Sequence, residues 1–307
     1  MSESKPKAPS LTIGMPVYNG ERFVARALAS LIAQDFGDWI LIVADNCSTD
    51  GTCAAVEAFC RQDARIRLVR HEMNRGAVGN FLYLAEQANT PYFMWAAHDD
   101  EWSGNYIGAC LAQLNAHPDV GFASGMVVNI DAEGRHVRVY NSFISFGAKN
   151  AERRLRSYLV AREADGKANM IYSVYRTQIV RAVCSIPGIL DGWGADMAFV
   201  AAALARVRYL PAEDATLLKR ITSESDLRTA RALANRRYGE VEYRGYCSLS
   251  LHNAYTCHIC GSMPDRATSV IVKRTMRRLQ LMLFIRERLT RIFSLSLRAI
   301  NRFGRPF

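Results

Sequence analysis

Short apolar runs alternate with amphipathic segments over the first hundred residues of the chain. Four runs have the length of buried strands, and the segments between them have apolar residues at helical spacing. This alternation favours a parallel sheet with right-handed crossover helices. The expected strands are residues 11–15, 39–43, 66–70 and the run that begins at Tyr92, and the expected helices are residues 21–33, 52–61 and 78–87.

The fourth of these strands ends abruptly in carboxylates. The apolar run Tyr92–Ala97 is followed directly by His98, Asp99, Asp100 and Glu101. At the carboxyl end of a parallel strand such residues lie in the crevice where open α/β sheets bind ligands. Adjacent carboxylates need a compensating cation, and a hard divalent metal that carries a phosphate ligand is one such cation. The alternative is a solvated acidic turn before the next helix.

Polar clusters follow the other three strands as well. Tyr18 and Asn19 follow the first strand, residues 45–50 follow the second, and residues 74–76 follow the third. In a parallel sheet these loops lie along one edge, so their convergence indicates a nucleotide-type site. No G-x-G-x-x-G sequence follows the first strand, and the chain has no Walker A sequence. An ordinary dinucleotide or P-loop site is therefore excluded.

The pattern becomes mixed after residue 103. The expected helices are residues 103–116, with Ser103 as N-cap, 151–162, 177–184 and 197–205, and the expected strands are residues 120–128, 136–140 and 171–175. Asp196 precedes the very apolar helix from Met197. This carboxylate is either a charge favoured by the helix dipole or a general base in a pocket beside Trp193.

Taken in order, the loops resemble those of the inverting glycosyltransferases of family 2, which have the GT-A fold. Residues 12–19 (TIGMPVYN) are similar to that family's opening strand and P-x-Y-N loop, and residues 43–52 (VADNCSTDGT) to its VDDGSTDGT segment. Residues 74–76 (NRG) are similar to its N-x-G turn, and residues 97–100 (AHDD) occupy its D-x-D-D position. The similarity spans about residues 11–126 and continues more weakly to about residue 222. It implies an α/β fold of GT-A type, with a mostly parallel Rossmann-like sheet flanked by helices.

The resemblance also implies roles for the matching residues. Asp99 and Asp100 would hold Mg²⁺ or Mn²⁺ against the two phosphates of a nucleotide-sugar donor, and Asp196 would remove the proton of the acceptor hydroxyl. The metal neutralises charge on the leaving diphosphate, and an attacking hydroxyl needs only one carboxylate base, so inversion is expected. The implied nucleotide-binding residues are Pro16, Val17, Tyr18, Asn19, Asp45, Asn46, Asn74, Gly76 and Asp99.

Three positions depart from the family pattern. Ala97 stands where the family has its first D-x-D carboxylate, and Asn46 stands where it has the second aspartate of the base-binding pair. Arg220 and Thr222 lie near the position of a histidine in relatives. These departures place metal binding on the remaining carboxylates, Asp99 and Asp100, and make Arg220 a candidate replacement contact. They also leave open a catalytically inactive relative that acts as a membrane-associated scaffold.

The positive charge is concentrated at the C-terminus. Residues 261–307 contain eleven basic and two acidic residues, a net charge of +9 out of +10 for the chain. Residues 269–303 are predicted to be helical, with an apolar stripe that includes Val272 and Met276. Such a helix is typical of an anionic membrane interface, so we expect residues 265–307 to contact one. The alternatives are a stripe that packs on the domain, or nucleic-acid binding, which we do not expect because aromatic residues are not interleaved with the arginines.

Two further features bear on location. The first ten residues lack an apolar signal core, and no uncharged apolar run reaches the length of about 18 residues that spans a bilayer. We therefore expect a cytoplasmic protein, peripheral on the inner face of the membrane, with reduced cysteines. Cys257 and Cys260 have the spacing of zinc ligands but no second close pair beside them, and their pattern leaves zinc binding undecided.

The sequence thus predicts three parts: a tail (residues 1–10), a GT-A domain (11–225) and a basic helical extension (226–307). The domain would comprise a nucleotide-binding half (about 11–128) and an acceptor half (about 129–225). The expected activity is metal-dependent transfer of a sugar from a nucleoside diphosphate to a hydroxyl of a glycan or lipid-linked acceptor, in cell-surface polysaccharide synthesis. The motifs specify neither the sugar nor the acceptor, because the loops that line the pocket determine both.

Overall fold

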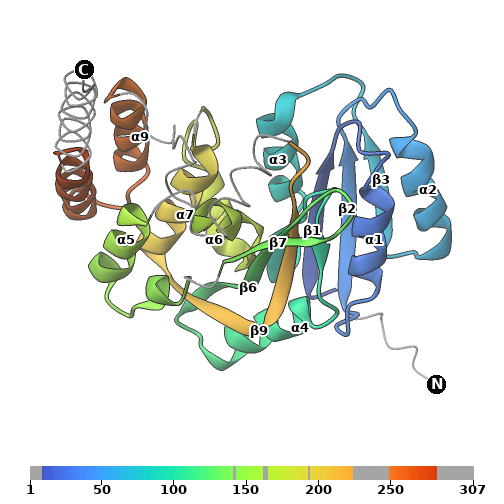
Figure 1. Ribbon diagram of the computed structural model, residues 1–307, viewed down its shortest axis with the longest axis horizontal. Coiled ribbons are helices and arrows are strands. Elements are labelled where there is room, and N and C mark those ends of the chain that lie inside the picture. The colour runs from blue at the N-terminus through green and yellow to red at the C-terminus, as the bar shows by residue number, and fades with distance from the viewer. Residues whose placement is uncertain (1–8, 141–142, 162–164, 193, 224–248, 282–307) are drawn as a thin grey trace, which may run out of the picture.

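One sheet organises the part of the chain that the computed structural model describes, namely residues 9–140, 143–161, 165–192, 194–223 and 249–281. Within these residues the sheet has nine strands in the order β3-β2-β1-β4-β8-β6-β9-β5, with β7 paired to β6 (Figure 1). The strands are β1 (Leu11–Val17), β2 (Trp39–Asp45), β3 (Ile66–Arg70), β4 (Tyr92–Trp95), β5 (Glu101–Trp102), β6 (Val120–Ile130), β7 (His136–Tyr140), β8 (Val174–Arg176) and β9 (Arg208–Arg220).

Helices cover both faces of this sheet. They are α1 (Val24–Ile32), α2 (Thr52–Gln62), α3 (Gly76–Glu86), α4 (Tyr106–Ala116), α5 (Ala151–Val160), α6 (Thr177–Cys184), α7 (Ala195–Arg206) and α9 (Leu249–Gly261), with the 3-10 helices η1 (Phe143–Gly147) and η3 (Lys167–Tyr172). In the N-terminal part α1 and α2 lie on one face and α3 on the other (Figure 1). The first four strands pair in parallel, so the predicted α/β fold with a mostly parallel, Rossmann-like arrangement is confirmed.

Strand directions decide which loops meet. The short strand β8 is antiparallel to both β4 and β6, and β9 is parallel to β6. Because β8 runs opposite to β4, and β6 runs opposite to β8, both β6 and its parallel partner β9 run in the same direction as β1 to β4. The carboxyl ends of these six strands therefore lie along one edge of the sheet. That edge receives both the carboxylates after β4 and the last residues of β9.

Three parts of the prediction beyond residue 100 differ from the structure. The predicted strand 171–175 is confirmed only for Val174 and Tyr175 of β8, because η3 extends to Tyr172, and Glu101, for which no strand was predicted, lies in β5 opposite Leu218. Helix α4 begins at Tyr106 after Asn105, not after Ser103. The long strand β9 was not predicted at all. It accommodates a register shift next to Gly125, where a Cβ atom would come within 2.4 Å of the Ala215 carbonyl oxygen.

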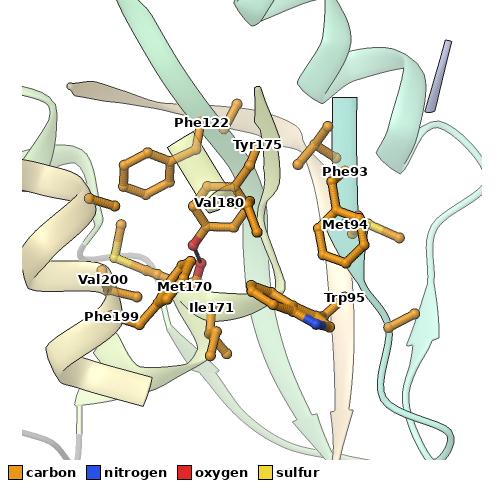
Figure 2. Close-up of a cluster of buried hydrophobic side chains, with 14 of the residues drawn as sticks. Phe93, Met94, Trp95, Phe122, Met170, Ile171, Tyr175, Val180, Phe199 and Val200 are labelled. Carbon is orange, nitrogen blue, oxygen red and sulfur yellow. Dashed lines mark hydrogen bonds between the residues drawn. The ribbon is translucent and has the colours of Figure 1, made fainter. Parts of the chain in front are cut away.

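An aromatic cluster joins the two halves of the predicted domain. Trp95 of β4 packs edge-on against Phe199 of α7 with ring centroids 5.2 Å apart, and its Nε1 donates to the Phe81 carbonyl oxygen (Figure 2). Tyr175 of β8 stacks on Phe122 of β6 at 4.9 Å (Figure 2). Helix α7 is buried on all sides from Met197 to Leu204, so its first turn is held firmly in place.

The C-terminal residues pack on the domain as far as they are described. Residues 266–281 are helical, and the side chains of Val272 and Met276 are fully buried in the core, whereas Lys273 and Arg274 are exposed. In this part of the predicted extension the apolar stripe therefore faces the domain, as in the packing alternative. The rest of the extension, residues 226–248 and 282–307, lies outside the described residues. None of the described helices has the length and apolarity that crossing a membrane requires.

The packing of the aromatic cluster leads to a prediction about the free energy of unfolding. Phe199→Ala removes a fully buried ring that contacts both Trp95 and Tyr175, and we expect it to lower the free energy of unfolding by about 3–5 kcal/mol. Urea denaturation followed by tryptophan fluorescence measures this change. Ile144→Ala, at an exposed site in η1, is the control and should change the free energy by less than about 0.5 kcal/mol. Equal effects of the two substitutions would contradict this account of the core.

Candidate functional site

The loops after β1 and β2 are bound to each other by Asn19. This residue has a left-handed φ of +50°, which asparagine tolerates better than most residues. Its Oδ1 accepts from the Thr49 backbone N–H (2.9 Å), and its own N–H donates to Ser48 Oγ (2.8 Å). The preceding side chain, Tyr18, remains about half exposed. The loop geometry thus fixes a ring at the edge of the sheet while leaving that ring open to solvent.

Asp45, the last residue of β2, is a buried carboxylate with unused acceptor capacity. Its Oδ2 accepts from the Ser48 backbone N–H (3.1 Å). Its Oδ1 is buried, and no N–H or O–H group of the described residues donates to it. The Cys53 thiol hydrogen-bonds to the Asp45 carboxylate, and burial together with this contact raises the pKa of the thiol. A thiol is a weak donor, so Oδ1 still has capacity for a stronger N–H or O–H donor.

Asn46 ties the loop after β2 to the loop after β3. Its Nδ2 donates to Asn74 Oδ1 (2.9 Å) and to the Gly76 carbonyl oxygen (3.2 Å), while its Oδ1 accepts from the Arg75 backbone N–H (2.8 Å). An aspartate here would place a carboxylate oxygen against two acceptors. The amide at this position is therefore explained by the fold. The three predicted nucleotide contacts Asn46, Asn74 and Gly76 form one cluster.

The carboxylate after β4 that was expected to share the metal is enclosed. The Asp100 side chain is fully buried, its Oδ1 accepts from the Arg220 backbone N–H (2.9 Å), and its Oδ2 accepts from Lys219 Nζ (3.0 Å). Burial raises the pKa of Asp100 to about 6, although Lys219 opposes this shift. Both oxygens of Asp100 are therefore engaged by the end of β9.

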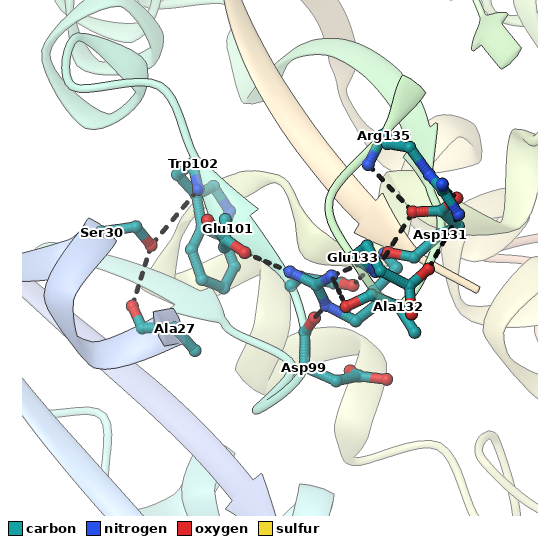
Figure 3. A network of polar contacts seen from close by, with 11 residues as sticks. Ala27, Ser30, Asp99, Glu101, Trp102, Asp131, Ala132, Glu133 and Arg135 are labelled. Carbon is teal, nitrogen blue, oxygen red and sulfur yellow. Dashed lines mark hydrogen bonds and ion pairs between the residues drawn. The ribbon is translucent and has the colours of Figure 1, made fainter. Parts of the chain in front are cut away.

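Asp99 differs from its neighbour. Its backbone carbonyl oxygen accepts from Arg220 Nε (3.0 Å), but its carboxylate accepts no hydrogen bond from the described residues. Figure 3 shows this carboxylate turned away from the network around Glu101 and Trp102. The adjacent imidazole of His98 is largely buried, and burial lowers its pKa, so this side chain is neutral at neutral pH. Asp99 thus presents the open carboxylate of the pair.

Arg220 is used entirely by the fold. Its guanidinium is buried, pairs with Glu101, and donates to the carbonyl oxygens of Asp131 (2.8 Å) and Ala132 (3.0 Å) as well as to that of Asp99 (Figure 3). These contacts contradict our expectation that Arg220 takes over a phosphate contact. Lys219, which the sequence did not suggest, is the basic residue next to Arg220 at the end of β9, and its side chain remains partly exposed. Predicting β9 would have shown that this lysine ends a strand at the same edge.

The predicted base, Asp196, lies in the first turn of α7. Gly194 at the N-cap has a φ of +75°, and Asp196 Oδ1 accepts from the Met197 backbone N–H (2.7 Å). Burial raises the pKa of this carboxyl group above its ordinary value. Burial also raises the pKa of Tyr172 at the end of η3, and the charges of Asp99, Asp100 and Asp196 add to that effect. The charges of the candidate metal ligands, Asp99 and Asp100, and of the candidate base, Asp196, therefore all act on the Tyr172 hydroxyl group.

The protein alone offers few metal ligands at this edge. Across the described ranges no three His, Cys, Asp or Glu side chains come together as a metal site. Cys260 donates to the Ser269 carbonyl oxygen (3.8 Å), and the side chains of Cys247 and His252 lie outside the description. Mg²⁺ is commonly held by one or two carboxylates together with substrate phosphates and water. Asp99 fits such a site, in which the donor supplies most of the ligands.

The comparisons with known proteins decide the family. The sequence model of glycosyl transferase family 2 matches residues 12–177, more than half of the chain. The chain belongs to this family. Residues 12–177 contain every candidate nucleotide and metal residue predicted above, whereas Asp196 lies outside the match.

Characterised relatives share only part of their length with the chain. It is 30% identical to the putative colanic acid biosynthesis glycosyl transferase WcaA of Escherichia coli over 112 residues, which cover 36% of this chain and 40% of the relative. It is 32% identical over 104 residues to the E. coli UDP-Glc:alpha-D-GlcNAc-diphosphoundecaprenol beta-1,3-glucosyltransferase WfgD, covering 34% and 40%. The match spans less than half the length of these relatives.

Solved structures agree in fold. TarS residues 1–349 of Staphylococcus aureus in complex with UDP gives a TM-score of 0.55 at 17% identity, covering 88% of each chain. The mannosyltransferase PcManGT of Pyrobaculum calidifontis in complex with GDP-Man and Mn²⁺ gives 0.52 at 16% identity, covering 92% of this chain and 81% of that one. At these identities the likeness establishes the GT-A type of fold alone.

The hydrogen bonds of the Asn46 side chain lead to a prediction about stability, because they require an amide and not a carboxylate. Asn46→Asp preserves the shape of the side chain but replaces its donor group with an acceptor, and we expect a loss of about 1–3 kcal/mol in stability at neutral pH. Thermal unfolding measures the change. Asn115→Asp is the matched control, because Asn115 is exposed and only accepts, from the Tyr92 hydroxyl (2.7 Å). An Asn46 variant as stable as the control would contradict the role assigned to this amide.

Proposed function

We propose that the chain transfers a sugar from a nucleoside diphosphate sugar to a hydroxyl group of a glycan or lipid-linked acceptor, with inversion, in the synthesis of a cell-surface polysaccharide. The observation that carries the proposal is the position of Asp45 and Asp99 at one sheet edge, with Asp196 held near the same edge by α7. The names of relatives such as WfgD support a nucleotide-sugar donor and a diphosphate-linked acceptor.

Asp45 supplies the acceptor for the nucleotide base. Its buried Oδ1 lacks an N–H or O–H donor in the described part of the chain, and an N–H group of a base is a donor of suitable size. Pro16, Val17, Tyr18 and Asn19 form the wall beside it, with the half-exposed Tyr18 ring available for stacking. Asn46, Asn74 and Gly76 support this pocket through their mutual hydrogen bonds.

Asp99 would hold a divalent ion. Mg²⁺ or Mn²⁺ at this carboxylate would supply Lewis-acid stabilisation of the leaving diphosphate. The Mn²⁺ in the PcManGT complex supports this class of cofactor. Asp100 stands behind Asp99 and holds the end of β9 in place, in contrast to our first expectation of a second ligand.

Asp196 accepts the proton of the acceptor hydroxyl. A carboxylate whose pKa is raised by burial is a stronger base than an exposed one, and its pKa lies closer to neutral pH. A single base acting with direct attack on the sugar requires no covalent enzyme intermediate, and this corresponds to inversion. The acceptor half, residues 129–225, would provide the surroundings of this carboxylate.

The acceptor would be reached at a membrane surface. Residues 266–281 expose Lys273, Arg274, Arg277 and Arg278, while their apolar stripe is buried. Attachment through these residues would be electrostatic, without insertion of the stripe. This placement corresponds to a peripheral protein on the inner face of the membrane, without a nucleic-acid partner.

Nucleotide binding tests the proposal directly. We expect UDP or GDP, or one of their sugar conjugates, to raise the melting temperature in a thermal-shift assay, and MnCl₂ to increase the shift. Asp45→Asn should weaken this binding about tenfold or more, because an amide N–H then faces the donor of the base. Asp214→Asn, at an exposed site, is the control. Stabilisation of the wild-type protein by no nucleotide would overturn the proposal.

The base is tested by its pH dependence. Asp196→Asn should lower kcat for sugar transfer by about 10²–10⁴-fold while the affinity for the nucleotide changes little. Because burial raises the pKa of Asp196, wild-type activity should fall as pH decreases through a value above that of an ordinary aspartate. Asp191→Asn, an exposed neighbour, should keep both the rate and the pH profile. Unchanged kcat in Asp196→Asn would assign the base elsewhere.

A further inference from the structure

Lys219 is a cation at the candidate site to which the proposed function gives no task. It is the penultimate residue of β9, opposite Asn129 of β6, at the edge where the parallel strands end. Its Nζ donates to Asp100 Oδ2 (3.0 Å). Burial lowers the pKa of Lys219, but Asp100, Tyr172 and Asp99 together outweigh this effect and raise the pKa. The side chain is therefore a stable ammonium group.

The contacts of this ammonium leave part of it open. An ammonium group has three N–H donors, and one of them is occupied by Asp100. Nζ lies 5.0 Å from the ring centroid of Tyr172, within cation–π range. No other hydrogen bond from Nζ reaches a described residue, and 23% of the side chain as a whole remains exposed. Two of the three N–H donors therefore have no hydrogen-bond partner among the described residues.

The next residue of β9, Arg220, is a cation whose contacts are all structural. Arg220 is completely buried, and its guanidinium pairs with Glu101 and donates to three carbonyl oxygens. If Lys219 served only to neutralise Asp100, it could be enclosed in the same way. It instead remains partly exposed, and the charge of Asp99 also raises the pKa of Lys219.

A divalent ion held by Asp99 would not neutralise all of the negative charge of a donor diphosphate at this edge. The described carboxylates offer one open metal ligand, Asp99, so a bound divalent ion would depend mostly on the phosphates themselves. A diphosphate carries more negative charge than one weakly held ion neutralises. A fixed ammonium at the same strand edge supplies the remaining complement without any reorganisation during the reaction.

We infer that Lys219 binds the diphosphate of the donor through Nζ, and that Asp100 is the positioning residue that holds this ammonium in place. The inference rests on the proposed function. In the transfer, the bond between the sugar carbon and the phosphate oxygen breaks, and its electron pair stays on the leaving diphosphate. The acceptor oxygen forms the new bond and passes its proton to Asp196. Lys219 keeps its proton throughout and stabilises the charge that develops on the leaving group.

Binding measurements without metal isolate this contact. Titration calorimetry with UDP, GDP and the parent nucleosides uridine and guanosine, in EDTA, compares the wild type with Lys219→Met, Lys219→Arg and the exposed control Lys149→Met. We expect Lys219→Met to weaken the diphosphate about 10–100-fold and the nucleoside less than twofold. Lys219→Arg should retain most of the diphosphate affinity, and Lys149→Met all of it.

The outcomes separate the two hypotheses. A wild type that binds no nucleotide even when MnCl₂ replaces EDTA defeats the proposed function. A wild type that binds the diphosphate in EDTA, with Lys219→Met binding it equally well, defeats only the role of Lys219. Lys219→Met leaves Asp100 buried without its cation, so the double variant Lys219→Met/Asp100→Asn removes both charges. It should recover the melting temperature but not the affinity, and recovery of both would assign Lys219 a structural role.

A measurement on the unmodified protein avoids any folding defect. In protein labelled with 15N-lysine, bound UDP or GDP in EDTA should shift the NMR resonance of the Lys219 ammonium group, which Lys219→Arg assigns by its loss, and should leave that of Lys149 unshifted. A Lys219 resonance that stays in place at a saturating diphosphate concentration would overturn the inference.

Discussion

The buried guanidinium of Arg220 is the constraint on which the site depends. It joins the end of β9 to the carbonyl oxygen of Asp99, to Glu101 of β5 and to the turn after β6. A buried cation that loses one of its partners is strongly destabilising, so these loops keep a fixed relation to one another. The backbone that presents Asp99 is therefore set by a residue that itself never reaches the substrate crevice.

In two pairs of adjacent charged residues, one side chain is enclosed and the other is at least partly exposed. Asp99 is open and Asp100 enclosed; Lys219 is partly open and Arg220 enclosed. In β9 the alternation of side chains along a strand accounts for the pattern, because Lys219 and Arg220 point in opposite directions, whereas Asp99 and Asp100 lie in the turn after β4. Each loop end thus contributes one group that holds the structure and one that remains available for chemistry. The enclosed charge of one segment holds the available residue of the other: Asp100 binds Lys219, and Arg220 binds the backbone of Asp99.

The sequence predicted the first hundred residues well because the information there is local. Each strand and helix from Leu11 to Trp95 has its own periodicity, and the polar loops follow from the parallel arrangement. Strand β9 depends instead on pairing with β6, and its acidic residues Glu213 and Asp214 hide it from pattern reading. Since β9 was missed, Lys219 was missed with it, and Arg220 was given a role that its burial contradicts. The roles of Asp45, Asp99 and Asp196 remain predictions, which the geometry of the site supports.

Strand β8 has a mechanical consequence. This three-residue strand of the predicted acceptor half lies between β4 and β6, both from the predicted nucleotide-binding half, and its Tyr175 packs into the same cluster as Trp95. The two halves therefore share one continuous sheet and one core, with no seam along which they could rotate as rigid bodies. Any closure over bound substrates must arise in the loops at the edge of the sheet, while the sheet itself stays still.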